Sequence, residues 1–142
     1  MSVFTPAEIA YLQSQLIGRI ATIGPNGQPH VVPVGFRYNP EHDSIDIGGM
    51  AEFTKRKHYR DIVRNPKVAY VVDDLPSVNP WTIRGIEIRG EGEVLTSGGE
   101  SIVPSFGPDM VRIRAKRIVS WGIAAPNAPA AARPATEQPA SS

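Results

Sequence analysis

The sequence predicts a small, mainly β protein in which about six antiparallel strands form a barrel that carries two helices. Three observations support this fold class. Most apolar positions lie in short runs rich in β-branched residues, separated by clusters of glycine, proline and asparagine. Only two segments place their apolar residues at helical spacing. The 142 residues, 41% of them hydrophobic, suffice for one domain with a buried core.

A helix is expected directly after the N-terminus. Thr5 can cap this helix, Pro6 occupies its first position, and Glu8 completes a capping box. Apolar residues at helical spacing should pack the helix against a sheet, and these residues are Ile9, Leu12 and Leu16.

The strands should follow in sequence order, with a second helix between the third and the fourth. Their expected ranges are 19–23, 30–38, 44–47, 67–74 and 81–95, with one or two last strands between 110 and 123. Pro33 cannot donate a ladder hydrogen bond, so it should mark an edge or a bulge of the second strand. The loops 75–80 and 96–108 are expected to form the walls of a pocket.

The chain divides into a barrel domain, residues 1–124, and a tail, residues 125–142. Alanine, proline and serine dominate the tail, which offers too little apolar surface to offset the entropy of ordering. We therefore expect the tail to be disordered and dispensable.

The segment 52–67 concentrates positive charge. It has six basic and two acidic residues, a net charge of +4, whereas the rest of the chain has nine basic and twelve acidic residues, a net charge of −3. Such local charge favours a discrete anion over a nucleic acid. Thr54 should cap the helix of this segment, with Arg56 and Lys57 in its first turn. A phosphate would gain backbone N–H donors and two cations there, and a solvated cationic face is the alternative. Because cations are unfavourable at a helix start, removal of Lys57 should leave stability unchanged or raise it.

Several chemistries lack the residues that they need. Cysteine is absent, which excludes disulfides, thiolate metal sites and thiol nucleophiles. Histidine spacing typical of a metal site, a G-x-S-x-G motif, a Walker loop and a G-x-G-x-x-G loop are all missing. No apolar run approaches the ~20 residues of a membrane span, and no signal peptide is recognisable. We expect a cytoplasmic protein that binds neither membrane nor nucleic acid and that, as an enzyme, would take its chemistry from a cofactor.

Four stretches resemble one known family. They are GRIATIGPNGQPHVVPVGFRY, IDIGG, KHYRDIVRNPKVAYVVDD and the terminal IVSWGI. Over residues 4–123 the chain resembles the split β-barrel flavoproteins of the pyridoxamine 5′-phosphate oxidase family, and more closely their branch of flavin/deazaflavin oxidoreductases, group B. The resemblance implies an FMN-binding split barrel that forms a homodimer, with two cofactor sites along the subunit interface.

The resemblance also implies residues for the cofactor phosphate. Lys57 matches a phosphate-binding position, whereas Arg56 and His58 replace a small residue and a second lysine. A neutral imidazole binds an anion more weakly, so Arg60, one turn further on, is expected to compensate. Trp121 matches a position near the site of the partner subunit, and its alternative role is to pack in the core.

The second strand distinguishes this chain from the oxidases of the family. Those enzymes bind FMN with an Arg and a Lys that lie five positions apart. This chain has Val32 and Arg37 at the two positions. The loss of the first cation argues against a pyridoxamine phosphate oxidase. The residues expected along the cofactor ring are Val32, Pro33, Val34, Gly35 and Phe36, with Arg37 beside them, and those expected at the phosphate are Thr54, Arg56, Lys57, His58 and Arg60.

One function follows from the resemblance, and alternatives stay open. We expect a reductase that transfers hydride between the deazaflavin coenzyme F420 and an electron-poor acceptor, such as an enone, a quinone or a tetrapyrrole. No metal is expected, and no side chain stands out as a catalytic acid. An FMN-dependent oxidoreductase of the same fold is the nearest alternative, followed by a non-enzymatic protein that stores a cofactor or binds haem.

Overall fold

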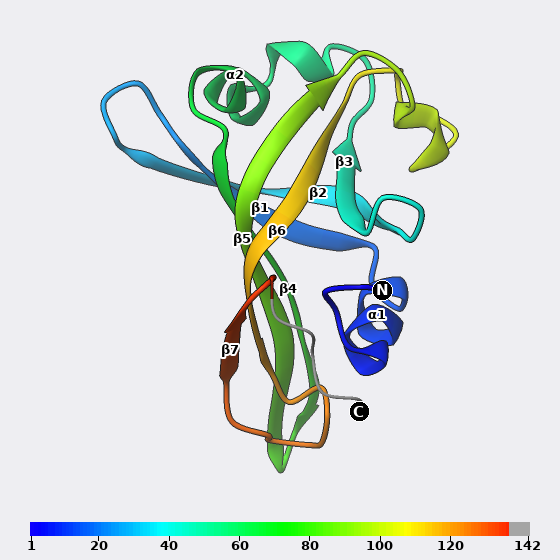
Figure 1. Cartoon of the computed structure of the whole chain (residues 1–142), viewed down its shortest axis with the longest axis vertical. Helices are drawn as coiled ribbons and strands as arrows, with labels where there is room; N and C mark the ends of the chain where they lie inside the picture. The colour runs from blue at the N-terminus through cyan, green and yellow to red at the C-terminus, as the bar shows by residue number, and fades with distance from the viewer. Residues whose placement is uncertain (137–142) are drawn as a thin grey trace.

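A computed structural model describes residues 1–136, which form seven antiparallel strands and two α-helices (Figure 1). The mainly β class is confirmed, with one strand more than expected. The elements in chain order are α1 (Pro6–Gln13), β1 (Ile17–Ile23), β2 (Pro29–Asn39), β3 (Ser44–Gly48), the 3₁₀ turn η1 (Phe53–Lys55), α2 (Lys57–Arg64), β4 (Lys67–Val78), β5 (Trp81–Leu95), the 3₁₀ turn η2 (Gly99–Ser101), β6 (Met110–Trp121) and β7 (Ala131–Pro134).

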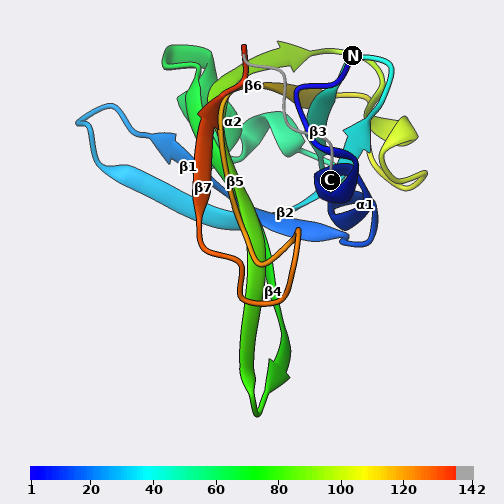
Figure 2. The ribbon, with the colours of Figure 1, turned by 60° about the horizontal axis from the view of Figure 1, so that its bottom comes forward.

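The strands close into a barrel through a contact between segments far apart in the sequence. Their order is β3-β2-β1-β4-β5-β6-β7, and β3 also pairs with β6. This pairing, which places Asp46 opposite Arg112, completes the barrel and leaves β7 as an outer strand along β6 (Figure 2). The split β-barrel fold predicted from the sequence is therefore confirmed.

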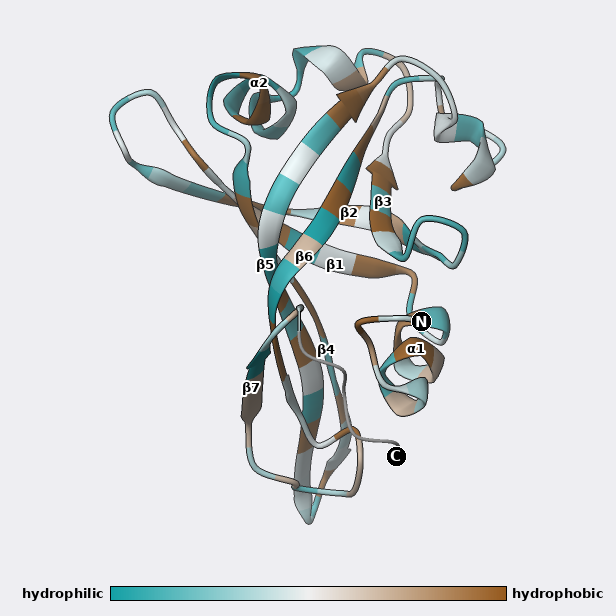
Figure 3. Cartoon of the chain, in the orientation of Figure 1, coloured by the Kyte–Doolittle hydropathy of each residue, from teal (hydrophilic) through white to brown (hydrophobic). Residues whose placement is uncertain are grey.

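Alternate residues of the strands fill the barrel. Ile20 on β1, Tyr70 on β4 and Ile88 on β5 lie opposite one another across the sheet, and all three are fully buried. Figure 3 shows the corresponding alternation of hydrophobic and hydrophilic residues along the strands. Burial of each such side chain stabilises the fold by about 1.5–3 kcal/mol.

The N-terminal helix begins as predicted. The Thr5 hydroxyl accepts a hydrogen bond from the N–H of Glu8, and the Glu8 carboxylate accepts one from the N–H of Thr5. Leu12 is buried, but Leu16 is 84% exposed because α1 ends at Gln13 and Leu16 lies in the link to β1. No helix formed by residues 1–136 is long and apolar enough to cross a membrane.

The prediction of a disordered tail is wrong for the part of it that the structure describes. Ala131–Pro134 forms β7 on the edge of β6, and Ala135 is buried in the core. Arg133 donates hydrogen bonds of 2.6 and 3.1 Å to the two carboxylate oxygens of Glu8 on α1. A buried ion pair between the two ends of the chain thus orders a segment whose own apolar surface is small. Residues 137–142 of the predicted tail lie outside the described residues.

β4 and β5 continue beyond the barrel as a two-stranded arm, residues 74–84 (Figure 1). β1 pairs with β4 only as far as Val71, and β6 reaches β5 only at Gly85, so neither strand flanks the arm. The end of the arm exposes apolar side chains, 70% of Val78 and 60% of Trp81. The predicted loop 75–80 belongs to this arm and lines neither of the two cavities described below.

Candidate functional site

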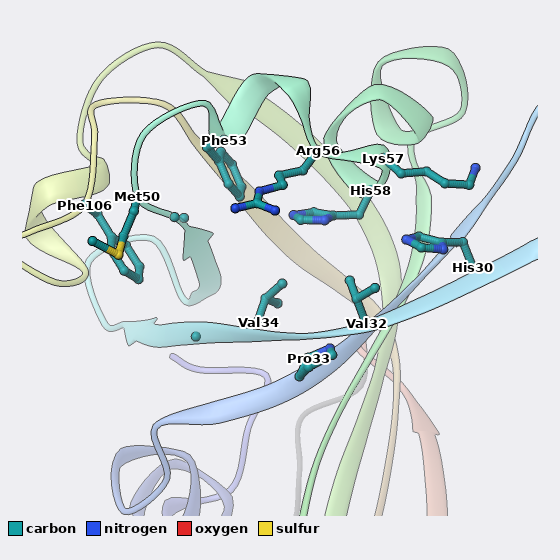
Figure 4. Close-up of a pocket in the computed structure, with 13 residues that line it drawn as sticks. His30, Val32, Pro33, Val34, Met50, Phe53, Arg56, Lys57, His58 and Phe106 are labelled. Atoms are coloured by element: carbon teal, nitrogen blue, oxygen red, sulfur yellow. The ribbon is translucent and has the colours of Figure 1, made fainter.

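A cavity of about 550 Å³ opens between β2, the link that follows β3, and the start of α2 (Figure 4). Sites for small molecules typically measure ~300–1,000 Å³. His30 and Lys57 lie at one end of the cavity, and Met50 and Phe106 lie at the other. The cavity is therefore basic at one end and apolar at the other.

One wall of the cavity is the outer edge of β2. Residues 29–35 pair only with β1, because the pairing of β2 with β3 starts at Phe36. Pro33 lies in this half-paired stretch opposite Arg19, so the prediction of an edge position is confirmed. Four residues that the sequence assigned to the cofactor ring line the cavity, namely Val32, Pro33, Val34 and Gly35.

The structure does not bring Phe36 and Arg37 to this cavity. From Phe36 onward β2 pairs with β3 instead of β1, and the Phe36 side chain turns into the core. Its ring packs edge-to-face on Tyr70, with 5.6 Å between the ring centroids. Arg37 is exposed and lines a separate cavity. The predicted ring contacts of these two residues lack support from the geometry.

The helix start at the basic end is not capped by Thr54, and that prediction is wrong. Thr54 lies in the 3₁₀ turn η1, which follows Glu52 in a left-handed conformation with φ of 68°. Arg56 is the N-cap residue of α2, with extended backbone, and its side chain makes no capping hydrogen bond. Because no side chain in the described part of the chain caps the first N–H groups of α2, these donors remain available to an anion.

Two cations of the basic segment, Lys57 and Arg64, pair with the buried carboxylate of Asp61. This carboxylate accepts hydrogen bonds from Thr22 at 2.9 Å, from Lys57 at 3.1 and 3.2 Å, and from Arg64 at 3.2 Å. Burial alone would raise the pKa of Asp61, but these three donors together lower it below its ordinary value. Lys57 therefore stabilises a buried carboxylate, in contrast to the prediction that its removal leaves stability unchanged.

Arg56 and Lys57 point in opposite directions along the cavity (Figure 4). The ammonium of Lys57 lies beside the β1–β2 turn, 3.2 Å from where a Cβ on Gly24 would be. The guanidinium of Arg56 points toward the apolar end, and within residues 1–136 it pairs with no carboxylate. The cavity thus holds one cation that already has a partner and one that is free to meet a ligand.

His58 is a buried imidazole in the wall of the cavity. It is 5% exposed, its ring packs edge-to-face on Phe53 with 5.3 Å between centroids, and its Nε2 atom has no hydrogen-bond partner among residues 1–136. Burial, together with the positive charges of His30 and Arg56, lowers the pKa of His58 to about 4. The imidazole is therefore neutral at physiological pH and presents a polar atom that the fold leaves unpaired.

Acid should destabilise the protein through His58. The unfolded chain binds a proton at His58 below its ordinary pKa of 6.5, whereas the folded chain does so only near 4. Proton uptake therefore favours the unfolded state, and the free energy of unfolding should fall as the pH drops from 6.5 to 4, by about 3 kcal/mol in total. Urea unfolding of His58→Leu across this range should show a flatter pH dependence than the wild type. The matched control is His42→Leu, because His42 is exposed, and a wild-type slope in His58→Leu would contradict the assignment.

Two more predicted residues lie away from the cavity. Arg60 is exposed one turn further along α2 and does not line the cavity. Trp121 packs on Gly85 of β5, where an added Cβ would lie 2.6 Å from the indole ring. Within one chain, Trp121 therefore packs against the sheet, which was the alternative role expected for it. A role at the site of a partner subunit stays a prediction.

Sequence reasoning missed several residues of the cavity, namely His30, Gly48, Gly49, Met50, Phe53 and Phe106. The Gly-Gly pair after β3 was a usable signal, because a Cβ on Gly48 would lie 3.1 Å from the Phe106 ring. Phe106 lies in the loop 96–108, which the sequence predicted as a wall of the pocket, although the sequence did not single out this residue. Within residues 1–136 no group of three His, Asp or Glu side chains could hold a metal ion.

Comparison with known proteins identifies a related reductase, two solved structures of similar fold, and a family. A reductase of Streptomyces rimosus subsp. rimosus, named 5a,11a-dehydrotetracycline/5a,11a-dehydrooxytetracycline reductase, is 42% identical over 120 residues, 84% of each protein. A solved structure named F420 reductase is 23% identical, with a TM-score of 0.59 over 77% of this chain and 93% of that chain. The FAD binding protein from Mycobacterium smegmatis is 17% identical, with a TM-score of 0.62 over 84% and 96% of the two chains. At these identities the two structures show a shared fold.

The family match spans nearly the whole chain. Residues 4–133 match the family described as pyridoxamine 5′-phosphate oxidase, from the residue before the N-terminal cap to the third residue of β7. The matched range includes every residue of the cavity, and the relative with 42% identity covers most of the same range. This chain therefore belongs to the pyridoxamine 5′-phosphate oxidase family.

Proposed function

We propose that this protein is a reductase that transfers hydride between the deazaflavin coenzyme F420 and an electron-poor organic acceptor. The observation that carries this proposal is the cavity between β2 and α2, which is basic at one end and apolar at the other. A relative that is 42% identical and bears the name of a reductase supports the same class of reaction.

The residues of the cavity fit a cofactor with a phosphate arm and a planar ring. At the start of α2, the first N–H groups of the helix donate to no capping side chain among residues 1–136, with Lys57 on the side of the basic end and Arg56 on the other side, an arrangement that favours a phosphate. Val32 and Val34 offer an apolar surface along the exposed edge of β2. His58 adds an unpaired, neutral hydrogen-bonding group in the wall.

The protein would contribute position and environment to the reaction. When bound, reduced F420 supplies the hydride from C5 of its ring. Met50, Phe53 and Phe106 line an apolar end that would surround part of a bound ring with apolar side chains. Among the described residues, no carboxyl group lines the cavity, so water is the proton source in this proposal.

The chemistry named for the relative suggests the acceptor. The name of this relative describes its substrates as 5a,11a-dehydro compounds, which have a carbon–carbon double bond between ring positions 5a and 11a. We therefore favour an enone-type double bond over the quinone and tetrapyrrole alternatives for this chain. Hydride addition to such a bond develops negative charge on the conjugated oxygen, and a nearby cation stabilises that charge.

Equilibrium titration tests the cofactor. The purified protein is titrated separately with F420 and with FMN, and the fluorescence of each cofactor is followed. We expect one F420 site per chain and an FMN affinity at least roughly tenfold weaker. A preference for FMN would replace the deazaflavin in this proposal, and binding of neither cofactor would contradict it. An F420-binding protein that oxidises the reduced cofactor with no acceptor would be a storage protein.

We also propose that the protein works as a homodimer, as the family resemblance implies. Val31, on the outer edge of β2, is 65% exposed, and the arm ends in exposed Val78 and Trp81. Burial of such apolar surfaces and edges against a second copy stabilises a dimer. Light scattering at micromolar concentration should give about twice the 15.4 kDa chain mass. Val31→Glu should shift the protein toward the monomer, and a wild-type monomer with full cofactor affinity would exclude a site shared between subunits.

A further inference from the structure

A second cavity, of about 280 Å³, lies beside the first between the end of α1 and the half of β2 that pairs with β3. It shares no lining residue with the first cavity. Its volume falls just below the ~300 Å³ at which sites for drug-sized molecules begin. Such a space suits one part of a ligand better than a complete cofactor.

The two cavities meet at two glycines. Gly35 and Gly48 both line the first cavity, and the Phe106 ring lies 3.6 and 3.1 Å from where their Cβ atoms would be. The side chain of Ile102, which lines the second cavity, lies 3.1 Å from the same position on Gly48. On the side of α1, the carbonyl oxygen of Leu16 lies 3.7 Å from the Cβ position of Gly35. The loop that carries Ile102 and Phe106 therefore forms a thin partition between the cavities.

The second cavity combines one cation with apolar walls. Arg37 is exposed and, within residues 1–136, pairs with no carboxylate, whereas Arg19 on the neighbouring strand β1 pairs with Asp73. The walls include Leu16, Phe36, Tyr38 and Ile102.

Leu16 is held in place although its side chain is exposed. Its carbonyl oxygen accepts a hydrogen bond of 3.3 Å from the N–H of Phe36, which fixes the backbone beside the cavity. Its side chain is nevertheless 84% exposed. An exposed apolar side chain on an anchored backbone, in the same cavity as an unpaired guanidinium, matches a ligand that is apolar and carries one negative charge.

We infer that this second cavity is a binding subsite for an aromatic or polycyclic compound that carries an acidic group, which Arg37 binds. The identification of this ligand as the hydride acceptor rests on the proposed function, but the subsite itself does not. An acceptor seated here would extend past Phe106 toward the first cavity, with its acidic group held at Arg37. A solvated surface arginine, by contrast, would show no preference for aromatic anions.

Binding of 8-anilinonaphthalene-1-sulfonate tests the subsite, because this fluorescent probe joins an apolar aromatic body to one sulfonate. Arg37→Gln should weaken its binding roughly tenfold or more through loss of a charge-assisted contact. Leu16→Asp should weaken binding as well, because it places a negative charge beside the sulfonate. The matched control is Arg60→Gln, since Arg60 is also exposed and unpaired in the described structure but lines neither cavity. N-phenyl-1-naphthylamine, the same aromatic body without a sulfonate, should bind equally to the wild type and to Arg37→Gln.

The outcomes separate this inference from the proposed function. The probe should bind protein saturated with F420, because the cavities share no residues. Three results would each overturn the subsite. The probe could be displaced by F420, it could fail to bind the wild type, or Arg37→Gln and Arg60→Gln could weaken its binding equally. A protein that binds the probe through Arg37 but does not bind F420 would keep the subsite and contradict the proposed function. For the acceptor, Arg37→Gln should raise KM for an acidic enone and leave the F420 affinity unchanged.

Discussion

Arg133→Met should lower the free energy of unfolding by about 3–5 kcal/mol, the usual cost of removing one partner from a buried ion pair. The Arg133 side chain is 17% exposed and donates to both carboxylate oxygens of Glu8 and to the carbonyl oxygen of Val3. Without it, the Glu8 carboxylate stays buried and keeps its capping bond from Thr5 but loses the cation that neutralises it. The loss should also release β7 from α1. Urea unfolding at neutral pH measures the change.

A surface ion pair between β5 and β6 provides the control. Arg114 pairs with Glu93 at 3.7 Å, and both side chains are more than half exposed. Arg114→Met should therefore cost less than about 1 kcal/mol. A similarly small loss of unfolding free energy for Arg133→Met would mean that the ion pair does not hold the C-terminal segment. It would then support the prediction from the sequence that the tail is dispensable.

Lys57→Ala should weaken F420 binding by roughly ten- to over a hundredfold, since a charge-assisted contact to the phosphate contributes about 1.5–3 kcal/mol. It should also lower the free energy of unfolding by about 1–2 kcal/mol, because Lys57 donates to the buried Asp61 while Thr22 and Arg64 still satisfy that carboxylate. The second effect has the opposite sign to the stability change expected from the helix dipole alone. Fluorescence titration and urea unfolding of the same variant measure the two effects separately.

Lys67→Ala is the control for diffuse attraction. Lys67 begins β4 at the far end of the basic segment and does not line the cavity. Its removal should change neither F420 affinity nor stability by more than about 0.5 kcal/mol. Equal, salt-sensitive losses of affinity in both variants would show general attraction by the basic segment and would contradict a phosphate site at the start of α2.

Features that depend on neighbouring residues were predictable from the sequence. The capping box needs only Thr5 and Glu8, and both of its hydrogen bonds are present. Pro33 predicted an unpaired edge because it lacks an N–H, and that edge became one wall of the cavity. Strands β1 to β6 were located to within a few positions from their apolar and β-branched residues, whereas β7 was missed.

Features that depend on distant residues were missed or misplaced. Glu8 and Arg133 lie 125 positions apart, and neither residue signals the other in the sequence. Thr54 has the side chain of a cap, but the left-handed turn at Glu52 delays the helix until after Arg56. Arg37 follows the predicted ring-lining residues directly, yet the pairing of β2 with β3 carries it to a different cavity. Local pattern predicted the elements, whereas the position of each side chain depended on how the elements packed.

The most direct test of the reductase is a single turnover. The protein is loaded with reduced F420, mixed rapidly with an electron-poor enone, and the return of the absorption of the oxidised deazaflavin is followed. We predict that bound cofactor is oxidised at least roughly a thousandfold faster than free reduced F420 with the same enone, which corresponds to a barrier lower by about 4 kcal/mol. Oxidation of demonstrably bound cofactor at the rate of free cofactor, for enones of several sizes, would contradict the assignment of this protein as an F420-dependent reductase.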